Sequence, residues 1–132
     1  MSKENVETIK RMLEAISIGD VETMLVLQDR DWEGFIPDGL PLAGRWRGYD
    51  GLRAFAEEWL EVWDEFRVEP ESFITDGDAV LATGHYWGRG RGSGVEVTER
   101  WYYAYRFREG RVVSWRPYAD RAEALADLGL ED

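Results

Sequence analysis

Residues 101–130 read WYYAYRFREGRVVSWRPYADRAEALADLGL, and this stretch decides the fold. The aromatic and β-branched runs on either side of Glu109-Gly110 predict two antiparallel strands joined by a tight turn. Asp120 then has the position of a helix N-cap and Gly129 that of a C-cap, so a short helix is expected between them. The last third of the chain is therefore expected to run strand, turn, strand, helix.

Upstream of this stretch, the pattern predicts three helices and then further strands. Gly19 ends a first amphipathic helix, Asp20 caps a second, and Asp50 caps a third that carries a wide apolar stripe. Helices followed by an antiparallel meander predict an α+β fold, in which a curved, mostly antiparallel sheet wraps the N-terminal helices around an internal pocket. The expected elements are helices at about 4–17 and 21–28 and from 50 to about 66, an extended piece at 32–36, a loop at 37–48, and strands at about 67–75, 79–89, 95–108 and 111–118.

The composition limits the class of protein. A length of 132 residues suits one domain with a single core, so residues 1–132 are expected to form one domain. The net charge of −11 disfavours nucleic acid and anionic membranes as partners. Without cysteine there is neither a disulfide nor thiolate chemistry. No apolar run has the length of a membrane span or the form of a signal peptide, so a cytoplasmic protein is expected.

Four motifs carry a family resemblance: Asp50-Gly51 at the third helix, Thr83-Gly84-His85, FREGRVV at 107–113, and WRPYAD at 115–120. With these motifs the chain resembles the SnoaL-like group of the nuclear-transport-factor-2-like superfamily, over essentially its whole length. The resemblance implies a ketosteroid-isomerase-like cone with an internal pocket. It does not select an activity, because the superfamily includes isomerases, polyketide cyclases, epoxide hydrolases, dehydratases and non-catalytic binding modules.

Three activities of the superfamily can be compared with this chain. Its steroid isomerases would place an acid where this chain has Tyr103, so their complete catalytic set is absent. Its epoxide hydrolases would have their Asp–Arg–Asp arrangement at Thr83, His85 and Pro117, and all three differ, which disfavours that activity. Its cyclases have an element that Gly84-His85 resembles, but the acid is again replaced by Tyr103.

His85 is the only histidine of the chain and the first catalytic candidate. Histidine is the residue type whose ordinary pKa lies near neutrality, which suits a general base; the alternative is a half-buried structural side chain. If the hairpin tip is centred on Gly92, Glu99 lies directly opposite His85 and would orient the imidazole. A one-residue shift instead places Thr98 opposite His85 and sends Glu99 to the other surface.

The strand at about 95–108 carries large rings on both of its faces. The resemblance implies that the odd-numbered residues of this strand face inward. Tyr103 is then a candidate hydrogen-bond donor to a ligand oxygen or, alternatively, a core tyrosine. Rings on the outer face are expected to be covered as well, which favours a homodimer packed sheet against sheet. The candidate ligand-binding residues are Trp32, Thr83, Trp87, Trp101 and Trp115.

Three hypotheses about function follow. The first is a cofactor-independent isomerase, cyclase or lyase that transfers a proton on a small apolar, aromatic or polycyclic molecule, with His85, Glu99 and Tyr103 as catalytic residues. The second is a non-catalytic binding module for a hydrophobic ligand. The third is a structural dimer whose own rings fill the cone. No spacing of His, Asp and Glu predicts a metal site, and no cofactor is expected.

Overall fold

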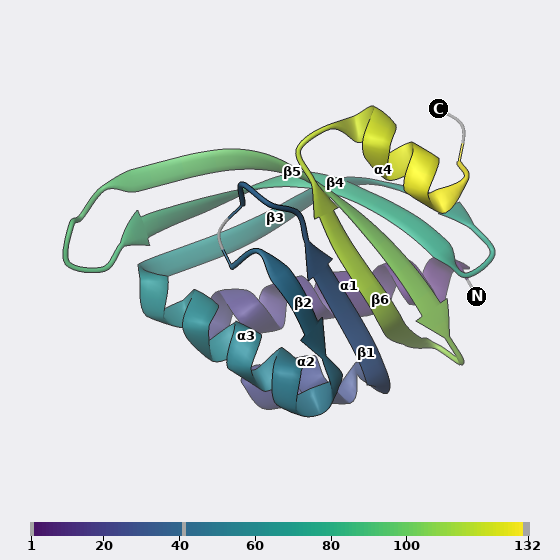
Figure 1. Cartoon of the computed structure of the whole chain (residues 1–132), viewed down its shortest axis with the longest axis horizontal. Coiled ribbons are helices and arrows are strands. Elements are labelled where there is room, and N and C mark those ends of the chain that lie inside the picture. Colours follow the sequence, from purple (N-terminus) through teal and green to yellow (C-terminus); the bar gives the residue numbers. More distant parts are fainter. Residues whose placement is uncertain (1, 41, 131–132) are drawn as a thin grey trace.

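The computed structural model describes residues 2–40 and 42–130 and confirms the α+β architecture (Figure 1). The helices and strands occur in the expected order, with one additional strand. The elements are α1 (Ser2–Ile18), α2 (Val21–Val26), β1 (Gln28–Ile36), β2 (Gly44–Arg47), α3 (Gly48–Val62), β3 (Trp63–Asp76), β4 (Ala79–Gly90), β5 (Glu96–Arg108), β6 (Arg111–Tyr118) and α4 (Arg121–Leu128).

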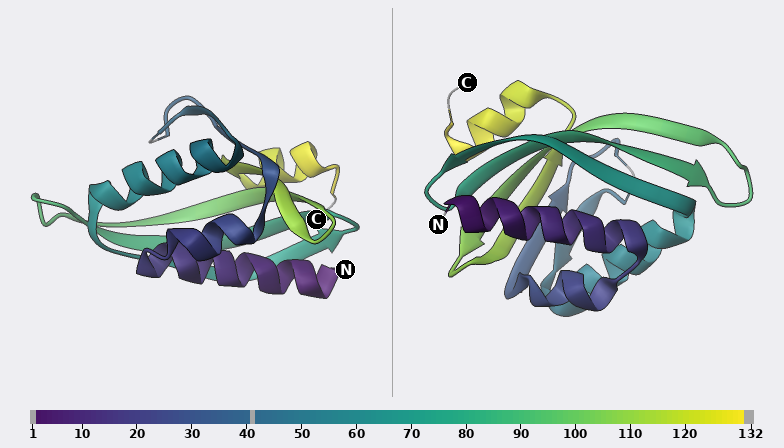
Figure 2. Two further views of the ribbon diagram at one scale, coloured as in Figure 1. Left: turned by 90° about the horizontal axis from the view of Figure 1, so that it is seen from below. Right: turned by 180° about the vertical axis from the view of Figure 1, so that it is seen from behind.

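The six strands form one curved sheet in the order β2-β1-β6-β5-β4-β3. Neighbouring strands are antiparallel except for β1 and β6, which run parallel, so the sheet is mostly antiparallel as expected. The sheet arches over α1, α2 and α3, while α4 lies on its outer side (Figures 1 and 2). We call the face of the sheet toward α1–α3 the inner face and the opposite face the outer face.

The N-terminal helices form where their caps and apolar spacing predict them. Gly19 ends α1 with a φ of +77°, a conformation that glycine adopts without steric cost. The Asp20 carboxylate accepts a hydrogen bond from the backbone N–H of Thr23 at 3.2 Å and thereby caps α2. The apolar stripe of α1 is buried beneath the sheet and includes Ile9, Met12, Leu13 and Ile16.

The central part of the chain departs from the predicted boundaries. The expected loop contains the short strand β2, and α3 begins at Gly48, so Asp50 lies in its first turn rather than at its N-cap. The helix also ends earlier than expected, because the backbone becomes extended at Trp63. Aromatic residues suit strands as well as helices, so the stripe that continues to Phe66 could not show where the helix stops.

The C-terminal third follows its sequence signals closely. Glu109 and Gly110 both have a positive φ, as a two-residue hairpin turn of type I′ requires. Asp120 caps α4 through the N–H of Ala122, and Gly129 closes it in the left-handed conformation. None of the helices in the described part of the chain is long and apolar enough to cross a membrane.

Candidate functional site

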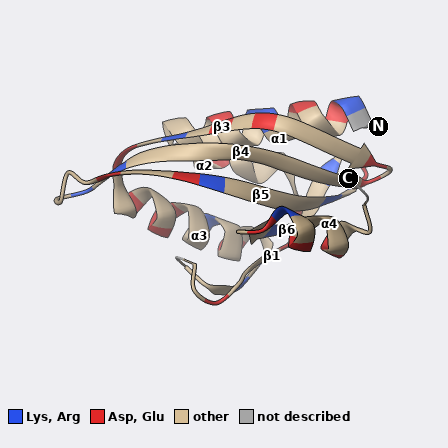
Figure 3. Cartoon of the chain, turned by 90° about the horizontal axis from the view of Figure 1, so that it is seen from above, with Lys and Arg blue, Asp and Glu red and all other residues tan. Residues whose placement is uncertain are grey.

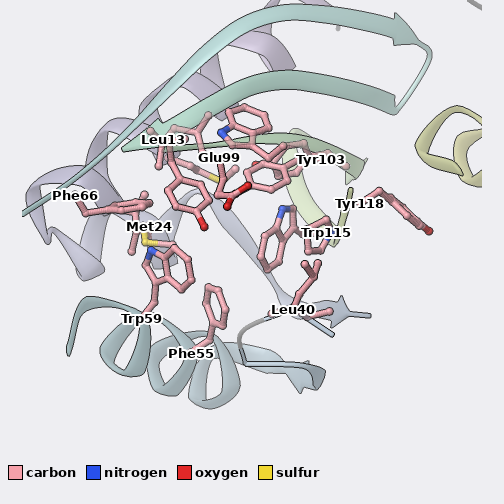
Figure 4. A pocket seen from close by; sticks show the side chains of 18 of the residues that line it. Leu13, Met24, Leu40, Phe55, Trp59, Phe66, Glu99, Tyr103, Trp115 and Tyr118 are labelled. Carbon is pink, nitrogen blue, oxygen red and sulfur yellow. The ribbon is translucent and has the colours of Figure 1, made fainter. Parts of the chain in front are cut away.

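A cavity of about 540 Å³ lies between the inner face of the sheet and the helices. Figure 4 shows that its side chains approach from opposite sides, with rings of α3 and β3 facing rings of β5 and β6. Most of the lining is aromatic or aliphatic, which is typical of sites for small molecules. The ring-bearing residues of the lining are Trp32, Phe55, Trp59, Trp63, Phe66, Tyr86, Trp101, Tyr103, Tyr105, Trp115 and Tyr118.

Two glycines of β4 make room for the tryptophans of the wall. A Cβ atom on Gly84 would lie 2.7 Å from the ring of Trp101, and one on Gly88 would collide with the ring of Trp63. A glycine in a strand often marks a place where another group approaches the backbone closely. Between the two glycines, Tyr86 is the residue of β4 that projects a large side chain into the cavity.

The register of β4 and β5 places Tyr86 directly opposite Glu99 on the inner face. Glu99 is the only acidic residue among the lining residues that the structure describes. Its side chain is exposed to solvent, and its carboxylate points into the open cavity (Figure 4). No hydrogen bond or ion pair holds Glu99 among the described residues. Burial raises the pKa of Tyr86, and the negative charge of Glu99 raises that pKa further.

Tyr103 also lies on the inner face, where the ring of Trp101 stacks on it at 4.1 Å. The ring of Trp115 crosses it at 80° from the neighbouring strand β6. Burial raises the pKa of Tyr103 far above its ordinary value, and the nearby Tyr86 contributes to the shift. The phenol therefore stays protonated at neutral pH and can donate a hydrogen bond.

Three of the predicted ligand-binding tryptophans, Trp32, Trp101 and Trp115, line the cavity. Their indole N–H groups, like that of Trp63, are buried without a hydrogen-bond partner within the described chain. Since these nitrogen atoms are inaccessible, the tryptophans present ring carbon rather than hydrogen-bond donors to the cavity. Two polar side chains of the described lining have partners elsewhere: the Gln28 amide donates to the Met24 carbonyl, and the Arg100 guanidinium donates to Glu71. The polar groups that remain to meet a ligand include the Glu99 carboxylate and tyrosine hydroxyls.

The predicted pairing of His85 with Glu99 is wrong. His85 lies opposite Arg100, because Arg89 pairs with Glu96 across the hairpin and the centre of the tip therefore falls between residues 92 and 93 rather than on Gly92. A shift of one residue turns a side chain to the other face of a sheet. His85 is therefore on the outer face, while Glu99 is on the inner one.

On the outer face His85 belongs to a charged cluster. Its Nδ1 atom lies 3.1 Å from Glu71 and its Nε2 atom 3.7 Å from Glu69. The Arg100 guanidinium donates to the other oxygen of Glu71 at 2.7 Å. Arg100 first, and then His85, lowers the pKa of the Glu71 carboxyl. His85 is thus a half-exposed member of an ion-pair network and does not reach the cavity.

Thr83 and Trp87 share the outer face with His85, so the expectation that they line the pocket is also wrong. The Thr83 hydroxyl forms a hydrogen bond with Ser72 on β3. The Trp87 indole donates to Glu96 at 2.9 Å, and Arg67 lies 4.7 Å from its ring. The three residues do alternate on one face of β4 as the sequence indicated, but that face is the opposite one.

Tyr86 is the functional candidate that sequence reasoning missed. The signal for it was the spacing of Gly84, Tyr86 and Gly88, in which a ring stands between two positions without side chains. The structure also brings Trp59 and Trp63 into the wall, at the end of α3 and the start of β3. Within residues 2–40 and 42–130, no group of three or more His, Asp or Glu side chains could hold a metal ion.

Comparison with known proteins gives one family and a consistent set of structures. The family model described as "SnoaL-like domain" matches residues 9–115. The NTF2-like protein from Burkholderia xenovorans is 33% identical, with a TM-score of 0.76 over 96% of this chain and 95% of its own. TerC, crystallised with polyporic acid, is 24% identical, with a TM-score of 0.80 over 95% of this chain and 97% of its own.

A third similar structure is that of a putative SnoaL-like polyketide cyclase from Jannaschia sp. CCS1. It is 17% identical, with a TM-score of 0.77 over 98% of this chain and 94% of its own. No curated protein sequence matches the chain. The structural matches cover nearly the whole length on both sides, so they bear out the fold expected from the motifs.

Proposed function

The chain belongs to the SnoaL-like domain family, and on that premise we propose that its cavity binds a small, largely apolar molecule, aromatic or polycyclic, and transfers a proton on it without a cofactor. The observation that carries the proposal is the position of Glu99. It is the one carboxylate among the described residues that line a cavity of about 540 Å³, and it stands between aromatic walls. This volume lies within the range of about 300–1,000 Å³ that is usual for the pockets of small-molecule ligands.

Glu99 is the general base of the proposed reaction. Its carboxylate takes a proton from a carbon next to a carbonyl group, and the electron pair of the broken C–H bond moves onto the carbonyl oxygen. The Tyr103 hydroxyl, which stays protonated because burial raises its pKa, donates a hydrogen bond to that oxygen. The carboxylic acid of Glu99 then returns the proton to the same or another atom of the ligand, which restores the enzyme.

The ligands and activities of similar proteins support this ligand class. TerC was crystallised with polyporic acid, and another neighbour carries the description of a polyketide cyclase. A flat, oxygen-bearing ligand would place its rings against Trp101 and Trp115 and an oxygen atom beside Tyr103. His85 has no part in this proposal, because its network with Glu71 lies on the outer face.

The test is hydrogen–deuterium exchange at carbon, with the bicyclic ketone 2-tetralone as the probe. In D₂O the wild-type protein should accelerate the loss of the α-proton signal in the NMR spectrum over buffer alone. Glu99→Gln should reduce the acceleration by a factor of about 100 or more, as expected for the loss of a general base. Glu96→Gln, on the outer face of the same strand, is the matched control and should keep the wild-type rate.

Two outcomes would contradict the proposal. If Glu99→Gln exchanges as fast as wild type, Glu99 is not the base. If 2-tetralone quenches the tryptophan fluorescence but wild type gives no exchange above buffer, the cavity is a non-catalytic binding site, which is the second candidate function. The third hypothesis, a cone filled by its own rings, is not favoured by a cavity of about 540 Å³.

We also propose that the protein forms a homodimer through the part of the outer face that α4 leaves uncovered. Trp87 is only partly buried there and is flanked by Arg67, Arg89 and Glu96. A two-fold interface brings each patch against its own copy, so a ring surrounded by both signs of charge can be self-complementary. Light scattering coupled to size-exclusion chromatography should give twice the chain mass for wild type and the single mass for Trp87→Asp; a monomeric wild type would refute the dimer.

A further inference from the structure

The charge of Glu99 is not paired with a positive charge by any residue that the structure describes. The basic residue along the described lining is Arg100, and its guanidinium binds Glu71 on the outer face at 2.7 Å. The residue opposite Glu99 is Tyr86, whose neutral phenol does not balance a negative charge. Glu99 is exposed to solvent, so water screens its charge in part, but a ligand that fills the cavity would displace that water and strengthen the attraction to an opposite charge.

The rings around the cavity favour the same sign of ligand charge. On one side, Trp59 lies 5.3 Å from Phe66 and 5.8 Å from Tyr86, between ring centroids. On the other side, Tyr103 lies 5.3 Å from Trp115. Figure 4 shows the Glu99 carboxylate between these two groups. Aromatic faces carry negative electrostatic potential and attract cations, and tryptophan does so most strongly.

The protein as a whole adds a third contribution. Its net charge is −11, with 27 acidic and 16 basic residues, so its long-range field draws cations in and opposes anions. The lone carboxylate, the ring faces and the overall field therefore all act in one direction.

From these observations we infer that the ligand of the cavity carries a positively charged amine or ammonium group, which lies beside Glu99 between the two aromatic walls. The inference rests on the function proposed above, in which this cavity is the binding site, and it specifies the class of ligand. A positive charge next to the reacting carbon also makes the neighbouring C–H bond more acidic, which assists a carboxylate base. The apolar remainder of the ligand fills the rest of the cavity.

The experiment compares two probes of the same shape, phenyltrimethylammonium and tert-butylbenzene, which differ only in a charged nitrogen or a neutral carbon. Their dissociation constants are measured by tryptophan fluorescence for wild type, Glu99→Gln and Glu96→Gln. Glu96 bonds Trp87 on the outer face, so Glu96→Gln removes one negative charge without touching the cavity. Urea unfolding of each variant verifies that its fold is retained.

The expected result is a ratio of cation to neutral affinity that falls at least ten-fold in Glu99→Gln and stays at the wild-type value in Glu96→Gln. An unchanged ratio in Glu99→Gln, with both probes still bound, would overturn the inference and leave the proposed binding cavity intact. A fall of equal size in both variants would also overturn it, since surface charge alone would then explain the preference. Binding of neither probe to wild type would refute the binding cavity itself, and the inference with it.

Discussion

The two faces of the β4–β5 hairpin differ in whether their ionisable side chains are paired. On the outer face, both His85 and Arg100 bind Glu71, so the carboxylate of Glu71 is paired. Figure 3 shows that acidic and basic positions both occur along the strands of this hairpin and its neighbour β3. On the inner face, one position nearer the hairpin tip on each strand, Glu99 and Tyr86 lie opposite each other, and no described residue forms a hydrogen bond or ion pair with the Glu99 carboxylate. The comparison shows that the paired carboxylate of Glu71 contributes to a surface ion-pair network, whereas the unpaired carboxylate of Glu99 remains available to a ligand in the cavity.

The largest expected difference between the faces concerns two tryptophans on neighbouring strands. Trp101 is 3% exposed and stacks on Tyr103, so Trp101→Ala should lower the free energy of unfolding by about 3–5 kcal/mol. Trp87 is partly exposed on the outer face, and Trp87→Ala should cost about 1 kcal/mol. Urea unfolding followed by circular dichroism measures both; equal losses would contradict the assignment of the two faces.

A smaller difference is expected between two adjacent residues of β4. Gly84→Ala places a methyl group against the Trp101 ring and the backbone of Glu69, and should cost about 2 kcal/mol of stability. His85→Ala, the next residue, removes only a half-exposed ring and should cost less than about 0.5 kcal/mol. The same unfolding experiment applies, and a Gly84→Ala protein as stable as wild type would show that Trp101 does not lie against this strand.

Tyr103 on the inner face should also lower the free energy of unfolding at alkaline pH. Burial, and then the neighbouring Tyr86, raises the pKa of Tyr103 in the folded state above its value of about 10 in the unfolded chain. The stability linked to this group is fully present below about pH 10 and is lost as the pH rises toward the folded-state value. Unfolding free energies measured between about pH 8 and pH 11 should therefore fall less steeply for Tyr103→Phe; the wild-type slope in that variant would oppose the prediction.

The smallest expected effect is spectroscopic. The NMR signals of the His85 ring are assigned without ambiguity, because the chain has one histidine. They should shift in Glu71→Gln, which changes the group 3.1 Å from Nδ1, and should stay within a line width in Glu99→Gln. The reverse pattern would place His85 beside Glu99 and would restore the pairing that the register excludes.

Where a signal is local, the sequence predicted the structure well. The strand, turn and helix from residue 101 onward depend on neighbours in the chain: positive φ at Glu109-Gly110 and the caps at Asp120 and Gly129. The inward set Trp101, Tyr103 and Trp115 was predicted through the family resemblance, and these residues do line the cavity. The end of α3 at Trp63 was not predicted, because an aromatic stripe suits a helix and a strand equally.

The sequence by itself determined the order of the helices and strands and the curved sheet over the helices, apart from the short strand β2 and the end of α3, since most elements follow from the periodicity and the turn and cap residues of their own segment. Which face of β4 holds the site was decided only by the tertiary structure. Arg91 at the hairpin tip donates to the carbonyls of Glu61 and Trp63, at 3.0 and 2.9 Å, some thirty residues earlier. These bonds hold the hairpin tip against the end of α3 and the start of β3. The register of β4 against β5 therefore depends on contacts between segments that are far apart in the sequence. That single step in register turns His85 outward and places Glu99 and Tyr86 in the cavity.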